Sequence, residues 1–585
     1  FCNNGQYYQN YTFVEFDRDF TRSGNLFSFE SNAGKETIIN MRIGLSYVSS
    51  DNAKSNLHAE NKDLNFDEIY QRADKLWNDK LNLIRTKGGT DKVRTLFYTS
   101  LYRSYFAPQI FSDVNGEFPE MGTNKIGKTE VPEIQYSTFS AWDTYRSLVS
   151  LQALTNPVDT SEQMRSLIRF AEHCGPEGKR GTFPMWVDNN TNSDIMPGDG
   201  SSILVAQAYA FGARDFDTNA AREIMMGTAK GDLQTCRGIV TLPAIKDYIA
   251  KGYIQQVDDT WRKSVSTSAS TTLEYVSTDW SIAQFLKSLK DPDAQIIDTT
   301  LDNDIKAMTV RSGNWKNVFN PNWKSVENQT WPQPQPRYPD GTWLSKWVGG
   351  SNQDLYFREG DPEQYTYMVH HDMRGLFKHL VKDSEKGSNN EESLLKRLEI
   401  FFTHLNAGMQ KPYLYIGNEP SFGHPFLYNW TSQPYKTQAL LRRIFDEQFH
   451  VTPEGLPGND DEGALSGWYV WAATGLYPEI LAIKGLTLSS PFFDAVEIYQ
   501  DEKRVVRINS NDGSLPYIQS VTVNGEQYDS TWVDLPKDDL LQIDFQVGSE
   551  PTCWGSSPDD DTLPPSFGSD GRQTPRLEGK CDLPL

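Results

Sequence analysis

The sequence has few cysteines, no long apolar run and no excess of basic residues. Its 585 residues include five cysteines, too few and too scattered for a zinc ribbon or a dense disulfide scaffold, although one or two structural disulfides remain open. Lys and Arg number 56 against 78 Asp and Glu, a net charge of −22, which disfavours nucleic-acid binding. No apolar run approaches the roughly 18–20 residues of a membrane span. These absences favour an acidic, soluble protein.

Aromatic residues are abundant in the chain, which also carries a few glycosylation sequons. It carries 15 Trp and 27 Tyr, and aromatic planes pack on the apolar faces of sugars, although core packing explains most such residues. Four Asn-x-Ser/Thr sequons start at Asn10, Asn189, Asn328 and Asn429. We therefore expect a secreted or extracellular protein, or one of the secretory lumen. The chain opens at Phe1 with neither an initiator Met nor a signal peptide, which indicates a processed or trimmed product.

The hydrophobic pattern divides the chain into a β region, a long helical region and a second β region. Residues 1–50 alternate as strands do, and near Asp67 the apolar spacing changes to three and four residues. Helices are expected over residues 67–86, 91–107, 139–155, 160–173, 201–213, 217–230, 241–251, 268–289, 365–383, 391–407, 435–449 and 462–475. About a dozen helices in succession suggest an α/α toroid. From about residue 480 alternation returns, with a hairpin signal at Asn524-Gly525.

Two motifs of other protein classes fail on their context. Residues 122–129 fit the letters of a phosphate-binding loop, but the segment runs into Val131-Pro132 and enters no helix. The pair His370-His371 lacks the spacing that would place two imidazoles on one helix face, so zinc hydrolysis is a weak interpretation. Nucleotide binding and zinc catalysis are therefore disfavoured.

Three segments concentrate carboxylates beside Gly, Pro and aromatic residues. They are residues 357–365, 416–421 and 458–463, and the last precedes a helix that is apolar on nearly every face. An acidic helix cap explains any one of them, but three together favour chemistry. A glycosidase needs one carboxylic acid to protonate the leaving oxygen and one carboxylate to activate water. Clustered Asn and Glu oxygens also suit Ca²⁺.

Together with these segments, motifs along the whole chain resemble the calcium-dependent exo-α-mannosidases of glycoside hydrolase family 92. The matching motifs lie at residues 15–18, 41–49, 111–116, 141–146, 417–421, 427–430, 436–438 and 458–463. The resemblance implies an (α/α)6 barrel catalytic domain preceded by the end of a β-sandwich and followed by a small β module. The implied boundaries are 1–62 for the C-terminal part of the sandwich, 63–90 for a linker helix, 91–480 for the barrel, and 481–585 for the β module and tail.

The same resemblance implies the roles of individual residues in an inverting hydrolysis of terminal α-mannosides. Glu359, in a Glu-Gly-x-x-x-Gln-Tyr context, would be the general acid, and Asp461 the general base, with Asp460 as a second candidate for that role. The implied calcium residues are Asn418 and Glu419. The implied substrate-binding residues are Trp142, Asp143, Trp186, His371 and His424. For Trp142, plain core packing remains an alternative.

Departures from the family pattern leave several points open. His424 stands in a Phe-Gly-His-Pro segment where many relatives carry two consecutive His, which leaves the linkage preference open. Asn459 stands where some relatives have Asp, which leaves the division of roles between Asp460 and Asp461 open. An α-1,2 linkage in N-glycans or mannans is expected on family frequency. Most of the sandwich is missing, so either a separate chain supplies it or it was trimmed. Alternative functions are another inverting (α/α)6 glycosidase, a phosphorylase, or a non-catalytic mannose-binding component.

Overall fold

The computed structural model describes residues 9–31, 34, 36–256, 267–290, 300–322, 331–344, 356–381, 391–537, 539–557 and 559–584. The α-helices are α1 (Ser50–Asn61), α2 (Phe66–Leu81), α3 (Asp91–Arg103), α4 (Ala141–Thr144), α5 (Leu148–Thr155), α6 (Pro157–Cys174), α7 (Gly200–Phe211), α8 (Thr218–Lys230), α9 (Ile245–Lys251), α10 (Ser268–Ser288), α11 (Leu301–Arg311), α12 (Pro362–Thr366), α13 (Met373–Val381), α14 (Glu391–Phe401), α15 (Tyr435–Gln448) and α16 (Ala464–Thr474).

Most strands lie at the two ends of the chain. The strands are β1 (Tyr11–Phe16), β2 (Phe20–Ser23), β3 (Leu26–Phe29), β4 (Met41–Ser46), β5 (Ile84–Lys87), β6 (Gln109–Ile110), β7 (Glu117–Pro119), β8 (Ile126–Lys128), β9 (Tyr136–Ser137), β10 (Val187–Asp188), β11 (Thr191–Asn192), β12 (Thr235–Cys236), β13 (Ile239–Val240), β14 (Phe319–Asn320), β15 (Gln333–Pro334), β16 (Leu476–Tyr477), β17 (Gly485–Leu488), β18 (Ala495–Gln500), β19 (Lys503–Ser510), β20 (Tyr517–Val523), β21 (Glu526–Gln527), β22 (Trp532–Asp534) and β23 (Leu541–Gly548).

The predicted helical region is confirmed, but individual helices differ from the prediction. The stretches predicted at 139–155 and 365–383 each form two helices rather than one. The sequence pattern missed α1 because that helix is mostly polar and buries only Ala53 and Leu57. At the other extreme, every residue of α10 from Ser268 to Leu286 is buried, so this helix lies inside the helical domain rather than on its surface.

The C-terminal β module is a six-stranded sheet with the order β21-β20-β23-β19-β18-β5. The hairpin at Asn524-Gly525 is confirmed: it joins β20 to β21, and both residues have positive φ (50° and 86°), as tight hairpin turns require. β5 comes from the stretch expected to be a linker helix, and it pairs with β18 through residues 84–87. The segment before the helical domain therefore completes the sheet that follows it.

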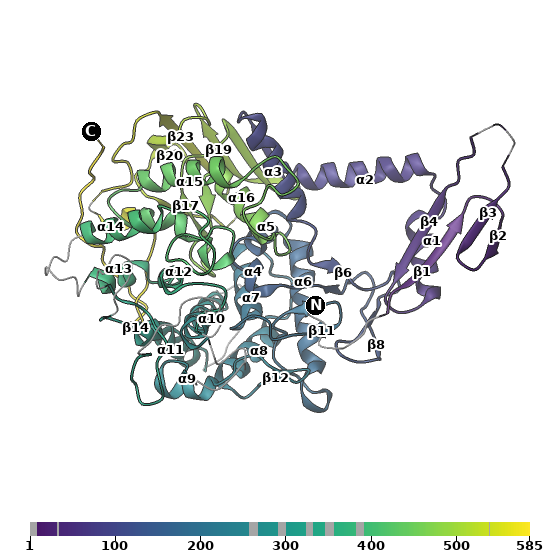
Figure 1. Cartoon of the computed structure of the whole chain (residues 1–585), viewed down its shortest axis with the longest axis horizontal. Helices are drawn as coiled ribbons and strands as arrows, with labels where there is room; N and C mark the ends of the chain where they lie inside the picture. Colours follow the sequence, from purple (N-terminus) through teal and green to yellow (C-terminus); the bar gives the residue numbers. More distant parts are fainter. Residues whose placement is uncertain are drawn as a thin grey trace.

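The N-terminal strands form a small module that stands apart from the helical domain, and α2 joins the two (Figure 1). None of the residues of α2, all of them described, is buried. β1 pairs with β4, and the pair exposes apolar side chains, including Met41 (54%), Ile43 (49%) and Leu45 (56%). Whether another chain covers them stays a prediction.

One buried carboxylate anchors this module to the main body. Asp113 accepts hydrogen bonds from Ser46 Oγ, Asn52 Nδ2 and Asn56 Nδ2, each at 2.7 Å. These bonds connect β4 and α1 to the loop after β6. They give a structural reason for two of the family-like motifs, those at residues 41–49 and 111–116.

The described residues form two disulfides and show where three of the sequons lie. Cys174 bonds Cys236, and Cys553 bonds Cys581 within the C-terminal tail. Of the sequon asparagines, Asn10 is exposed, while Asn189 and Asn429 are buried, so neither side chain offers an accessible acceptor in the folded protein; Asn328 lies outside the described residues. Among the described helices, none combines the length and apolarity needed to cross a bilayer.

The segment that resembles a phosphate-binding loop has a different structure. Residues 126–128 form β8, which pairs antiparallel with β7, and Val131-Pro132 is a cis peptide bond. No described helix follows this strand directly, so the disfavoured nucleotide site has no structural basis here.

Candidate active site

Four predicted site residues come from separate segments of the chain, and each lies at or just before the start of a helix. Asp143 lies in α4, Glu359 precedes α12, Glu419 begins a 3₁₀ turn (Glu419–Ser421), and Asp461 precedes α16. These residues are far apart in the sequence, so it is the packing of the helix starts that brings the carboxylates together.

Two glycines explain how closely two of these segments approach. A Cβ atom on Gly458 would lie 2.0 Å from the carbonyl oxygen of Gly417, and one on Gly417 would lie 2.5 Å from that of Pro457. Asn406 connects the same two loops, since its Nδ2 donates to Pro457 O at 2.8 Å and its Oδ1 accepts from Gly417 N at 3.2 Å. Backbone contact that only glycine permits therefore places Glu419 beside Asp461.

Asp143, Glu419 and Asp461 form a compact set that we call the acidic group. One carboxylate oxygen from each lies within 4.8 Å of the others. Asp143 and Glu419 are each 1% exposed, and Asp143 Oδ2 and both Oε atoms of Glu419 have no hydrogen-bond partner among the described residues. Burial, followed by repulsion from neighbouring carboxylates, raises the pKa of both residues well above their usual values. Buried, unpartnered carboxylates at this spacing are what a divalent cation requires, so the residues present fit the expected Ca²⁺.

Glu359 lies within electrostatic reach of this group. Burial raises the pKa of the Tyr415 phenol, and the charges of Glu359, Glu419 and Asp461 raise it further. Asn418 Nδ2 donates to the backbone carbonyl of Glu359 at 2.9 Å. The predicted calcium segment therefore also holds the backbone of the predicted general acid.

The structure gives Asp460 and Asp461 different surroundings. Asp460 accepts hydrogen bonds from Ser466 N at 2.8 Å and Ser466 Oγ at 2.9 Å, so its carboxylate holds the first turn of α16. Asp461 belongs to the acidic group, and burial raises its pKa, with the Asp460 charge adding to the effect. Asp461 (φ 43°), Glu462 (φ 58°) and Glu359 (φ 48°) all adopt left-handed backbone, a strain that proteins tend to keep at functional sites.

Trp142 is 2% exposed and belongs to a buried network beneath Asp143. Its indole Nε1 donates to Glu274 Oε1 at 2.9 Å, Arg146 Nη2 donates to the same oxygen at 3.0 Å, and Tyr145 OH donates to Glu274 Oε2 at 3.2 Å. Glu274 thereby fixes three side chains of the 141–146 motif. This network orients α4, and with it Asp143.

The other three predicted substrate residues lie in different surroundings. Trp186 is half-buried and directly precedes β10. The ring of His371 stacks on Trp280 (centroids 5.0 Å apart) and its Nε2 meets Ser312 O at 3.0 Å, while burial lowers its pKa to about 3. His371 therefore packs as a neutral ring of the helical interior, against Trp280 and Ser312 rather than in the acidic group.

His424 is fully buried, with edge contacts to the rings of Tyr367 and Phe401. Burial lowers its pKa well below the usual value, and the charges of His370 and Arg146 lower it further. Neither ring nitrogen has a hydrogen-bond partner in the described part of the chain. His424 is thus a buried neutral ring within reach of the Arg146 charge.

Several residues of the site were not predicted. Glu462 accepts from Ser140 N at 2.9 Å and Ser140 Oγ at 3.0 Å, which connects the start of α16 to the start of α4. Tyr415 and Glu274 were also missed. Glu274 had a usable signal, since it is an acidic residue within a helix that is otherwise almost wholly uncharged and buried. Tyr415 had none, because its neighbours in space come from distant segments.

Asp361 gives the acid-bearing segment a testable pH dependence. Its carboxylate accepts from Glu363 N at 2.9 Å, and full burial raises its pKa from 3.8 to about 7. Because the folded state holds this proton more tightly than the unfolded chain, the free energy of unfolding should fall as pH rises from about 4 to 7.

Asp361→Asn keeps the acceptor oxygen and cannot ionise. We expect this variant to exceed the wild type in stability by on the order of 2–4 kcal/mol at pH 8 and to differ little at pH 4. Urea unfolding of both proteins at the two pH values measures the difference. An equal difference at both would contradict a raised pKa.

Comparisons with known proteins agree with this geometry. The model of the glycosyl hydrolase family 92 catalytic domain matches residues 52–549. An uncharacterized secreted glycosidase of Arthroderma benhamiae is 24% identical over 596 aligned residues, covering 95% of this chain and 66% of the relative. The chain therefore spans about two thirds of the length of that relative.

Solved structures show the same fold. A family GH92 α-mannosidase from Bacteroides thetaiotaomicron superposes with a TM-score of 0.79 at 24% identity, covering 96% of this chain and 73% of the other. An inverting GH92 mannosidase from the same organism gives 0.78 at 22% identity, covering 95% and 75%. The first enzyme was also solved in complex with mannoimidazole. An α-rich glycosidase fold with a β module is thereby established.

Proposed function

This chain belongs to glycosyl hydrolase family 92, and from that premise we propose that it is an exo-acting α-mannosidase that hydrolyses terminal α-linked mannose with inversion. The observation that carries the proposal is the meeting of Glu359, Glu419 and Asp461 from three separate helix starts. The helices are proposed to form an (α/α)6 barrel with these starts at one end. N-glycans or mannans are the proposed substrates, with α-1,2 linkages favoured.

The two carboxylates have complementary tasks. Glu359, as a carboxylic acid, donates its proton to the glycosidic oxygen as the bond to the leaving sugar breaks. Asp461, as a carboxylate, accepts a proton from the water that attacks the anomeric carbon from the opposite face. Asp460 holds the turn that carries Asp461, and Asn418 holds the backbone of Glu359. Hydrogen bonds from sugar hydroxyls to Asp143 Oδ2 would orient the terminal mannose.

A calcium ion would be held by Glu419 and Asn418, with Asp143 and Asp461 in reach, and it would supply a positive centre for the oxygens of the sugar hydroxyls. The unpartnered oxygens of Glu419 support this assignment.

Secretion is proposed as well: both disulfides suit an oxidising compartment, and the curated fungal relative is named a secreted glycosidase.

The function is tested with α-1,2-linked mannobiose. We expect release of β-mannose, seen first by NMR before mutarotation, which stops on chelation and returns with added Ca²⁺. Initial release of α-mannose would contradict inversion. No release from any α-mannoside would refute the proposed activity.

Glu419→Gln should remove the effect of calcium on stability. In chelator the variant should melt a few degrees above the wild type, because one of three mutually repelling carboxylates, itself buried, is gone. Added Ca²⁺ should raise the Tm of the wild type and leave that of the variant nearly unchanged. Thermal unfolding with and without Ca²⁺ measures both effects, and an equal calcium-induced rise in the two proteins would place the ion elsewhere.

A further inference from the structure

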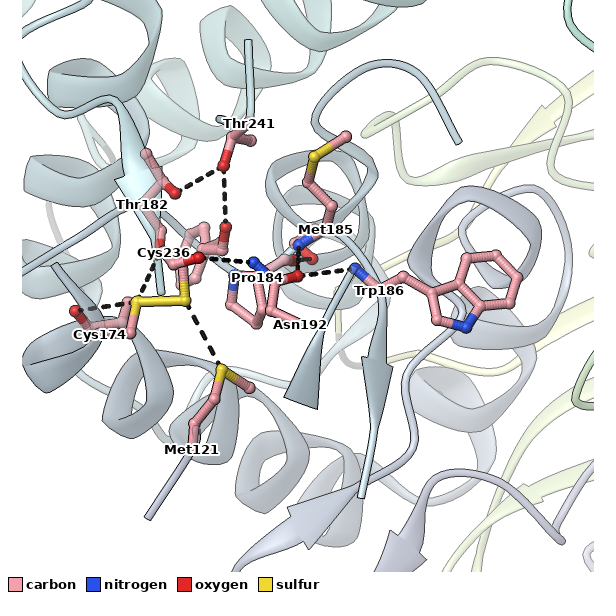
Figure 2. Close-up of a disulfide and its surroundings, with 12 residues drawn as sticks. Met121, Cys174, Thr182, Pro184, Met185, Trp186, Asn192, Cys236 and Thr241 are labelled. Atoms are coloured by element: carbon pink, nitrogen blue, oxygen red, sulfur yellow. Dashed lines mark hydrogen bonds between the residues drawn. A yellow bond between two sulfur atoms is a disulfide. The ribbon is translucent and has the colours of Figure 1, made fainter. Parts of the chain in front are cut away.

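The hairpin β10–β11 is tied to the Cys174–Cys236 disulfide through one side chain. Asn192 Nδ2 donates to the carbonyl oxygen of Cys236 at 3.0 Å, and its Oδ1 accepts from Met185 N at 2.9 Å and Trp186 N at 3.3 Å. Figure 2 shows this bridge, with the Trp186 indole pointing away from the disulfide. Asn192 is buried, so these bonds are shielded from water.

Two side chains of the hairpin segment are more exposed to solvent than the others. Between residues 181 and 193 every residue is buried except Trp186 and Asp188, which are half-buried. They flank Val187, and alternate residues of a strand share a face. An aromatic plane and a carboxylate therefore stand together on one face of the hairpin, a pairing that suits the apolar face and the hydroxyls of a sugar.

Backbone contacts join the hairpin to the segment that leads into Asp143. Val187 N donates to Phe139 O and Phe139 N donates to Val187 O, each at 3.0 Å. The next residue, Ser140, donates to Glu462, and the charge of Asp188 also acts on Glu462. The hairpin thus lies beside the segments that carry Asp143 and Asp461.

We propose that the hairpin β10–β11 borders the substrate site, presents Trp186 and Asp188 to the bound mannoside, and is fixed there by Asn192 through the Cys174–Cys236 disulfide. The inference rests on the proposed function and extends it. Asn192 is a positioning residue: it touches no reacting atom, but it holds the backbone of a residue that faces the sugar.

The variant Asn192→Asp tests whether Asn192 positions the hairpin for substrate binding or only stabilises the fold. The carboxylate retains acceptors for the Met185 and Trp186 amides but places an oxygen, in place of an N–H donor, against Cys236 O. We expect faster amide hydrogen exchange in the peptide spanning residues 185–193, and a KM for α-mannoside raised about tenfold with kcat changed less than about threefold. The double variant Cys174→Ser/Cys236→Ser should do the same, and Asp188→Asn should raise KM without changing the exchange.

The second disulfide supplies a matched control. Cys553→Ser/Cys581→Ser removes a bridge from the C-terminal tail, so it should lower Tm without raising KM. If Asn192→Asp and the Cys174/Cys236 variant lowered Tm and loosened the hairpin but left KM unchanged, the hairpin would be only structural and the proposal would be overturned. A wild-type chain that hydrolyses no α-mannoside would refute the proposed function, and this inference with it, before any variant is compared.

Discussion

Glu359→Gln should lower kcat on α-1,2-mannobiose by about 10²–10⁴-fold while it lowers kcat on an activated aryl α-mannoside far less. The amide is nearly isosteric but holds no acidic proton, so a sugar leaving group departs as an unprotonated alkoxide. An aryl leaving group with a low pKa needs little protonation. Steady-state kinetics on both substrates gives the two ratios.

One known contact of Glu359 does not involve its side chain. Asn418 Nδ2 donates to the backbone carbonyl of Glu359, so the substitution leaves this hydrogen bond in place. A matched control is Glu447→Gln, the same chemical change at an exposed ion pair with Arg443 on α15, which should leave both activities unchanged. Equal losses on the two substrates would remove Glu359 from the role of general acid.

The sequence predicted which residues form the site better than it predicted how those residues are arranged in space. The sequence showed that Gly417 and Gly458 belong to two acidic segments. It could not show that their backbones touch, because the two segments are about forty residues apart and meet only through packing. The two hydrogen bonds that Ser140 donates to Glu462 span an even longer separation. Periodicity reports which face of an element is buried, not which other element covers it.

The same limit explains the departures in the fold. α10 was visible because nearly all of its residues are apolar or small, whereas the polar α1 gave no periodic signal. β5 was assigned to a linker helix because four residues next to a long amphipathic helix continue its pattern, while its pairing with β18 depends on a strand some four hundred residues later. Short strands whose partners are distant are set by tertiary contacts rather than by local propensity.

Asp461→Asn is the second variant with a large expected effect, and unlike Glu359→Gln it should abolish turnover on both kinds of substrate. Without a carboxylate to accept its proton, the attacking water is a poor nucleophile whatever the leaving group, so losses of about 10³-fold or more are expected for each. Asp460→Asn is the neighbouring control: its amide oxygen can still accept from Ser466 N, so a modest loss of stability and small kinetic changes are expected.

The comparison of these two variants decides the base assignment. If Asp460→Asn stopped turnover and Asp461→Asn left ample activity, the base would be Asp460, and its hydrogen bonds to Ser466 would have to be remade when substrate binds. The observed contacts argue against that outcome, because Asp460 is already engaged in holding α16, whereas Asp461 lies in the acidic group beside Glu419. A carboxylate in this position is better placed to activate water than one that already accepts two hydrogen bonds from Ser466.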